Sequence, residues 1–217
     1  MVSTLHPLSD VAPEELLYRK DDPIFGKSYE QWTHNWWGWF VSIPYDRHPA
    51  KDSDGRFANI NANAEVIYLA GAVDRSAKRI VTIPHDKAVL VPILVIENSE
   101  KEWPGSGVDD LEKLSRGFAD DMISLTAVFD EGKESQAVFR TGFLASTRVD
   151  TREFNLDFAP NNIFLREGGQ GIKASQSGYW LFFREGVFKK RETDYTLRFH
   201  GEGEYYETEV SYTLRIG

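Results

Sequence analysis

A helical pattern of aromatic residues occupies residues 28–43. The large side chains repeat at spacings of three and four residues, at Tyr29, Trp32, Trp36, Trp39, Phe40 and Ile43, so they share one helix face. Ser28 followed three residues later by Gln31 is the signature of a capping box at a helix start. Pro44 marks the end, because its ring clashes with a preceding helical turn. We therefore predict an amphipathic helix at residues 28–43 with a buried aromatic face.

Most of the remaining chain alternates between apolar and polar residues, as half-buried strands do. The clearest case is at residues 207–216, where one face would carry Thr208, Val210, Tyr212, Leu214 and Ile216. Residues 66–70, 79–83 and 89–96 are rich in β-branched residues, which favour strands. A second amphipathic helix is predicted at residues 108–122, from the spacing of Leu111, Leu114, Phe118 and Met122.

These elements predict a mainly β fold. Helices are too few for repeated βαβ units, so we expect a single antiparallel β-sandwich, of jelly-roll or immunoglobulin-like type. It would contain about nine strands and be decorated by the two helices near residues 28–43 and 108–122. The aromatic helix would close one end of the sandwich. Residues 28–217 would form this domain, and residues 1–27 an N-terminal arm packed on it.

Charge and composition limit the classes of molecule that this protein is expected to bind. Among 217 residues, 34 are acidic and 25 basic, which gives a net charge of −9. Nucleic acid is therefore not expected as a partner, because it requires an excess of Lys and Arg. The absence of cysteine excludes disulfides and thiolate chemistry. No apolar run approaches the roughly 18 residues of a membrane span, so we expect a soluble protein, cytoplasmic if Met1 is native and otherwise exported with its signal removed.

Aromatic side chains are the best candidates for a ligand site. The aromatic fraction is 13%, with six tryptophans, and aromatic faces stack on sugar rings. Trp37 lies off the face shared by the other helix tryptophans, so binding is as good an interpretation as core packing. We predict a ligand site at Trp37, Tyr45, His48 and Trp103, near the aromatic helix and the polar loop after it.

A metal site is a weaker candidate. Glu30 and His34 are four residues apart on one helix, a spacing that can chelate a metal. Asp52 and Asp54, followed by Asn59, Asn61 and Asn63, give an oxygen-rich loop, although Gly55 comes too early for an EF-hand. A surface Glu–His pair and an ordinary Asp-rich turn are the alternatives. No cofactor is expected; calcium or a transition metal at Glu30, His34, Asp52 and Asp54 is the alternative.

Several segments together resemble a family of uncharacterised, often exported bacterial and archaeal β-rich proteins. They are GKSYEQW at residues 26–32, WWGW at 36–39, SIP at 42–44, VIYLAG at 66–71, the strand pair at 79–92, SGYWL at 177–181, YTLRFHG at 195–201 and VSYTL at 210–214. The resemblance implies one β-rich domain and no established activity. Family members carry cysteines near the positions of Arg56–Phe57 and Val81, and this chain has none.

The leading functional hypothesis is a non-catalytic β-sandwich that binds a small molecule, a glycan or a protein. The second is an enzyme, a metal-assisted hydrolase or isomerase that uses His34 or His48 with Glu30 and Asp52. The third is a structural or assembly subunit that forms a homo-oligomer through strand edges or an apolar patch.

Overall fold

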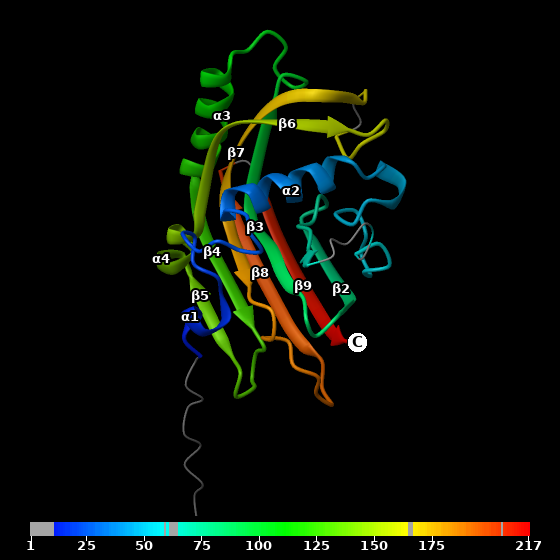
Figure 1. The fold of residues 1–217 in the computed structure, drawn as a ribbon, viewed down its shortest axis with the longest axis vertical. Coiled ribbons are helices and arrows are strands. Elements are labelled where there is room, and N and C mark those ends of the chain that lie inside the picture. Colours follow the sequence, from blue (N-terminus) through cyan, green and yellow to red (C-terminus); the bar gives the residue numbers. More distant parts are fainter. Residues whose placement is uncertain (1–10, 59, 61–64, 165–166, 205) are drawn as a thin grey trace, which may run out of the picture.

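The computed structural model describes residues 11–58, 60, 65–164, 167–204 and 206–217. Nine strands among these residues form two sheets (Figure 1). In order across the four-stranded sheet lie β1 (Val66–Tyr68), β3 (Ala88–Ser99), β7 (Gly169–Phe183) and β6 (Arg148–Phe158). The five-stranded sheet runs β2 (Ser76–Ile83), β9 (Glu207–Ile216), β8 (Tyr195–Gly203), β4 (Met122–Phe129) and β5 (Ala137–Arg140). The mainly β, sandwich-like prediction is confirmed.

The sheets are mixed, so the prediction of a purely antiparallel sandwich was wrong. β1 pairs in parallel with β3, and β2 pairs in parallel with β9, while the other neighbours are antiparallel. The cause is a crossing between sheets: the chain leaves the four-stranded sheet after β1, runs along β2 in the other sheet, and returns as β3 beside β1. Alternating side chains report which face is buried and carry no information on strand direction.

Alternating apolar residues fill the space between the sheets. On β9 the predicted inward residues Val210, Tyr212 and Leu214 are buried. One face of β8 contributes Tyr195, Leu197 and Phe199 to the same core. The two sheets come into close contact at Gly201 on β8. A Cβ there would lie 2.8 Å from the carbonyl oxygen of Ile93, so the contact requires a glycine.

Helix α2 (Tyr29–Val41) begins with the predicted capping box: the Gln31 N–H donates to Ser28 Oγ at 3.1 Å, and the Ser28 N–H donates to Gln31 Oε1 at 2.9 Å. The helix lies across the outer face of the four-stranded sheet (Figure 1). It does not close an end of the sandwich, because the outward residues of β1, β3 and β7 form a second apolar surface that its aromatic face covers. Burying about 150–250 Å² for each aromatic side chain contributes roughly 4–6 kcal/mol before entropy costs.

Helix α3 (Val108–Asp120) packs on β3, β6 and β7 and ends two residues before the predicted boundary, because Met122 already begins β4. Two short helices, α1 (Pro13–Leu16) and α4 (Thr141–Leu144), and two 3-10 turns, Tyr45–Arg47 and Ala145–Thr147, complete the fold. From residue 11 on, the predicted arm lies against the end of β7, where the Tyr18 N–H donates to the Phe182 carbonyl at 2.9 Å.

Candidate functional site

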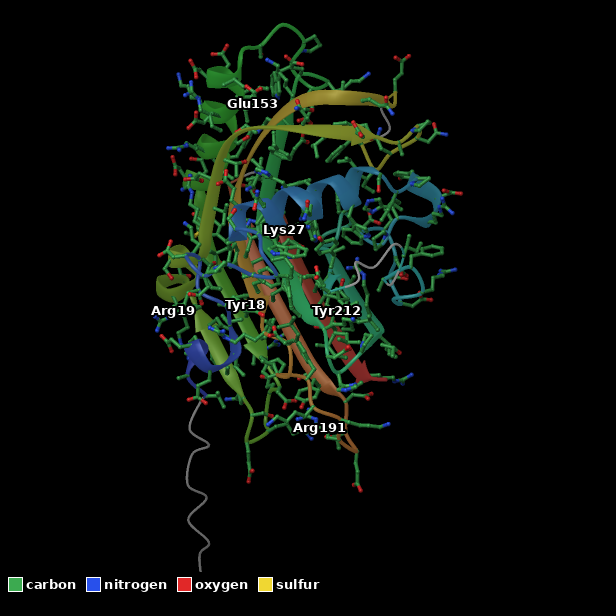
Figure 2. All side chains as sticks on the ribbon, in the orientation of Figure 1. Tyr18, Arg19, Lys27, Glu153, Arg191 and Tyr212 are labelled. Carbon is green, nitrogen blue, oxygen red and sulfur yellow. The ribbon has the colours of Figure 1, made fainter. Side chains whose placement is uncertain are left out.

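A clamp of two buried side chains turns the chain away from the four-stranded sheet after β1. The Tyr212 hydroxyl donates to the Ala70 carbonyl at 2.8 Å and accepts from the Ala70 N–H at 3.2 Å. The Arg79 guanidinium donates from Nη1 to the same hydroxyl, to the Ala70 carbonyl and to the Gly71 carbonyl at 2.8, 2.8 and 3.0 Å. Tyr212 is labelled on β9 in Figure 2. The clamp directs residues 70–73 towards the five-stranded sheet.

One edge of β3 is left open by this turn. β1 pairs only with Ala88–Leu90, and within the described chain no strand follows beside β3 on that side. Val95 and Ile96 are half-buried there, whereas Val91 and Ile93 further back are buried. The open edge forms the floor of a cavity of about 360 Å³, which we call the aromatic cleft.

Several segments beside β3 wall the aromatic cleft. Helix α2 contributes aromatic rings, the clamped turn contributes small side chains, and the start of β9 contributes polar ones; the lining beyond β3 is Trp36, Trp37, Phe40, Ala50, Gly71, Ala72, Val73, Phe164, Tyr206, Glu207 and Thr208. An apolar hollow with a few polar groups and a volume of roughly 300–1,000 Å³ is the usual form of a small-molecule site.

Trp37 is the predicted ligand residue that lines this cleft. Its ring is 4% exposed and is held edge-on by Trp36 and Phe40, with ring centroids 5.0 and 5.5 Å away. Its Nε1 is closed off from solvent and has no hydrogen-bond partner in the part of the chain that the structure describes. A buried donor without a partner costs about 1–3 kcal/mol, so this indole is an unusual feature of the site.

The other tryptophans show how unusual it is. Of the six, four donate to an oxygen at 2.7–3.0 Å, namely Trp32 to Ile24, Trp36 to Leu69, Trp39 to Ile60 and Trp103 to Asn98. Trp180 also has no partner among the described residues, but it does not line the cleft. Of the two tryptophans that line the cleft, Trp37 is therefore the one whose N–H has no partner within the described ranges.

His48 lies behind the cleft and supports its wall. The residue is 1% exposed. Its Nε2 donates to the Phe40 carbonyl at 2.9 Å, and its Nδ1 accepts from the Ala50 N–H at 3.1 Å. Burial lowers the pKa of His48 to about 4, so the imidazole is neutral at neutral pH. Both ring nitrogens are occupied, and His48 positions two residues of the cleft lining.

Tyr45 and Trp103 do not join Trp37. Tyr45 is half-buried beside the polar loop, with the Lys51 ammonium 4.4 Å from its ring centroid. Trp103 is 43% exposed and lines a separate hollow with Leu114 and Phe118 around α3. The structure therefore brings Trp37 near His48 through Phe40, and leaves the other two predicted ligand residues elsewhere.

The predicted metal ligands are also separate. His34 Nε2 lies 3.9 Å from Glu30 Oε1. The Asp52 carboxylate accepts three backbone N–H groups of its own loop, from Asp54, Gly55 and Phe57, at 2.7–3.1 Å. Asp54 faces Arg56, with Oδ1 3.3 Å from Nε. Within the described ranges no group of three or more His, Asp or Glu side chains could hold a metal, and Asn59, Asn61 and Asn63 lie outside those ranges.

The clamp and the open strand edge were missed by sequence reasoning. A signal for the clamp was present: Arg79 alternates with Val81 and Ile83, so it falls on the buried face of β2. The half-exposure of Val95 and Ile96 has no local signal, because residues 89–96 are uniformly apolar. The residue pattern of one strand cannot show where the neighbouring strand ends.

No protein-family model, curated protein or solved structure matches this chain. The site is therefore interpreted from its geometry. None of the helices in the described residues has the length and apolar character needed to cross a membrane.

Proposed function

We propose that this protein is a non-catalytic binding protein whose ligand occupies the aromatic cleft. The ligand is a small, mainly apolar molecule with one hydrogen-bond acceptor. The observation that carries this proposal is the Trp37 indole N–H, which is buried in the cleft wall without a partner in the described residues. A ligand acceptor would recover the hydrogen bond, while the surrounding rings would cover the ligand's apolar part.

Ligand entry requires the aromatic wall to part, because Trp37 Nε1 is closed off from solvent. Trp36 and Phe40 contact the indole edge-on. Binding would therefore include a rotation of these rings that admits an acceptor atom to Trp37 Nε1. A glycan suits this cleft poorly, since most of its lining is apolar and cannot satisfy several hydroxyl groups.

Nuclear magnetic resonance of the indole N–H groups tests the proposal. Acetophenone and α-methylstyrene are suitable probes, because they share a shape and only the first has an acceptor. Acetophenone is expected to shift the resonance of the Trp37 indole N–H hydrogen downfield. α-Methylstyrene is expected to leave the chemical shift of that hydrogen nearly unchanged. Trp37→Phe assigns the resonance. Trp39→Phe is the matched control, because the Trp39 N–H already donates to Ile60 at 2.7 Å.

Two results would contradict the proposal. One is that a set of apolar carbonyl compounds, acetophenone included, leaves the Trp37 resonance unchanged at millimolar concentration. The other is that the compounds bind equally well to Trp37→Phe, which would place them away from the cleft. The metal-dependent enzyme hypothesis has no supporting group of ligands in the described residues, and the assembly hypothesis is tested separately by light scattering.

A further inference from the structure

A second hollow lies beside α2, and we call it the helix groove. It has a volume of about 670 Å³ and is lined by His34, Asn35, Gly38, Trp39, Ser42, Tyr68, Phe154, Asn155 and Asp157. The last half of β6 runs alongside α2 (Figure 1), and the Ala159 N–H just beyond β6 donates to the Val41 carbonyl at 3.0 Å. The groove therefore runs between the β6 end, the helix and β1.

Gly38 is the first unusual feature of this groove. It sits inside α2, where glycine is less favourable than alanine by about a factor of five in the helix equilibrium. An added Cβ at Gly38 would meet nothing within 4 Å. No packing contact therefore requires glycine at this position. The missing side chain deepens the groove at its centre, which is the effect that a binding site needs.

Tyr68 and His34 are the second unusual feature. The Tyr68 side chain is buried, with 4% exposure, and its hydroxyl has no hydrogen-bond partner among residues the structure describes. His34 stacks on Phe154 with ring centroids 4.3 Å apart and an interplanar angle of 3°. Its Nε2 is likewise closed off and unbonded within the described chain. One buried hydroxyl and one enclosed imidazole nitrogen, both without a hydrogen-bond partner among the described residues, thus belong to side chains that line one hollow.

The chemistry of the lining selects the ligand. Asn35, Asn155 and Ser42 offer amides and a hydroxyl, which both donate and accept. Burial lowers the pKa of His34 to about 4 and raises that of Tyr68, so both are neutral at neutral pH. Among the described residues no Lys or Arg lines the groove, and Asp157 is the one carboxylate in that lining. Anionic ligands are disfavoured, and neutral ones with many hydroxyl groups fit.

We propose that the helix groove binds a neutral saccharide. The amide, hydroxyl and imidazole groups would hydrogen-bond the sugar hydroxyls, and Trp39 and Phe154 would cover the apolar ring faces. The Tyr68 hydroxyl and His34 Nε2 would gain the partners that they lack in the free protein. Because both atoms are enclosed, the lining side chains part as the sugar enters. This site is independent of the aromatic cleft, with which it shares no lining residue.

A glycan array followed by calorimetry tests the proposal. The array carries neutral glycans together with sialylated and sulfated ones, and the full chain is expected to bind members of the neutral group. The best neutral glycan is then titrated into variants. Gly38→Leu fills the groove and is expected to abolish binding. Tyr68→Phe removes one hydroxyl and is expected to weaken binding about tenfold, the effect of one good hydrogen bond.

Trp37→Phe is the matched control, because it changes the aromatic cleft alone and is expected to leave glycan affinity unchanged. Melting curves accompany each titration, and Gly38→Ala, which a helix accommodates better than glycine, replaces Gly38→Leu if the larger variant fails to fold. The proposal is overturned if no neutral glycan binds, if acidic glycans bind better, or if the groove variants bind as wild type. Loss of binding in Trp37→Phe alone would also overturn it.

Discussion

Two buried tyrosines with opposite hydrogen-bond environments provide a direct test of the structure. Tyr212 and Tyr68 are both nearly inaccessible, with 2% and 4% exposure. The Tyr212 hydroxyl has three partners, one of them the charged Arg79 guanidinium. The Tyr68 hydroxyl has none in the described part of the molecule. Replacing each by phenylalanine keeps the ring and removes only the oxygen, so the two changes should have opposite effects on stability.

The magnitudes follow from the contacts. A neutral buried hydrogen bond contributes about 0.5–1.5 kcal/mol and one to a charged group about 1.5–3 kcal/mol. Because Arg79 Nη1 keeps its two carbonyl partners, we expect Tyr212→Phe to lower the free energy of unfolding by about 2–4 kcal/mol. Tyr68→Phe removes an unsatisfied group and is expected to leave stability unchanged or to raise it by about 1 kcal/mol.

Urea and thermal denaturation measure this difference. For a chain of this size 1 kcal/mol corresponds to about 2–4 °C in Tm, so Tyr212→Phe should melt roughly 4–20 °C below Tyr68→Phe. Equal losses in the two variants would refute the reasoning, since they would show that Tyr68 has a hydrogen-bond partner in solution. A Tyr212→Phe variant as stable as wild type would show that the clamp is not needed to hold Ala70.

Three further predictions concern stability. The pKa of His48 falls from 6.5 to about 4 on folding, so the unfolded chain binds more protons between these values: stability should be full above pH 6.5 and decline towards pH 4, by up to about 1.4 kcal/mol per pH unit. His48→Gln should reduce that slope in urea titrations at several pH values and leave the part due to His34, whose pKa is likewise lowered to about 4 by burial; an unchanged slope would contradict the prediction. Gly201→Ala should cost about 1–3 kcal/mol, because its Cβ would lie 2.8 Å from the Ile93 carbonyl oxygen; a neutral result would show that the sheets separate easily. Asp52→Ala should lower Tm through three lost carboxylate contacts with backbone N–H groups. A wild-type Tm that rises on adding calcium, with no such rise in Asp52→Ala, would instead favour a metal at Asp52.

Local signals were sufficient for the elements of this fold. Ser28 and Gln31 predicted where α2 begins, and the alternation through Val210, Tyr212 and Leu214 predicted the inward face of β9. Both signals act between residues close in sequence. The direction of β1 relative to β3 depends instead on a crossing to the other sheet, and no residue in β1 carries that information.

The site was only partly predictable for the same reason. Trp37 was identified as a ligand candidate because it lies off the shared aromatic face of α2, and it lines the aromatic cleft. His48 looked equally available, but both of its ring nitrogens are bonded to nearby backbone. Tyr68 gave no signal, since a tyrosine in a strand is ordinary and only the surrounding structure shows that its hydroxyl lacks a partner.

The parallel pairing of β2 with β9 has a consequence for synthesis on the ribosome. Every registered partner of β2 lies in residues 209–216, about 130 positions later in the chain, and Tyr212 also completes the clamp at Ala70. Residues 70–83 therefore leave the ribosome long before their partners, and β2 stays unpaired until β9 has been synthesised. Contacts so distant in sequence slow folding and expose strand edges meanwhile. The nascent protein should need protection by chaperones until residues 207–216 have left the exit tunnel.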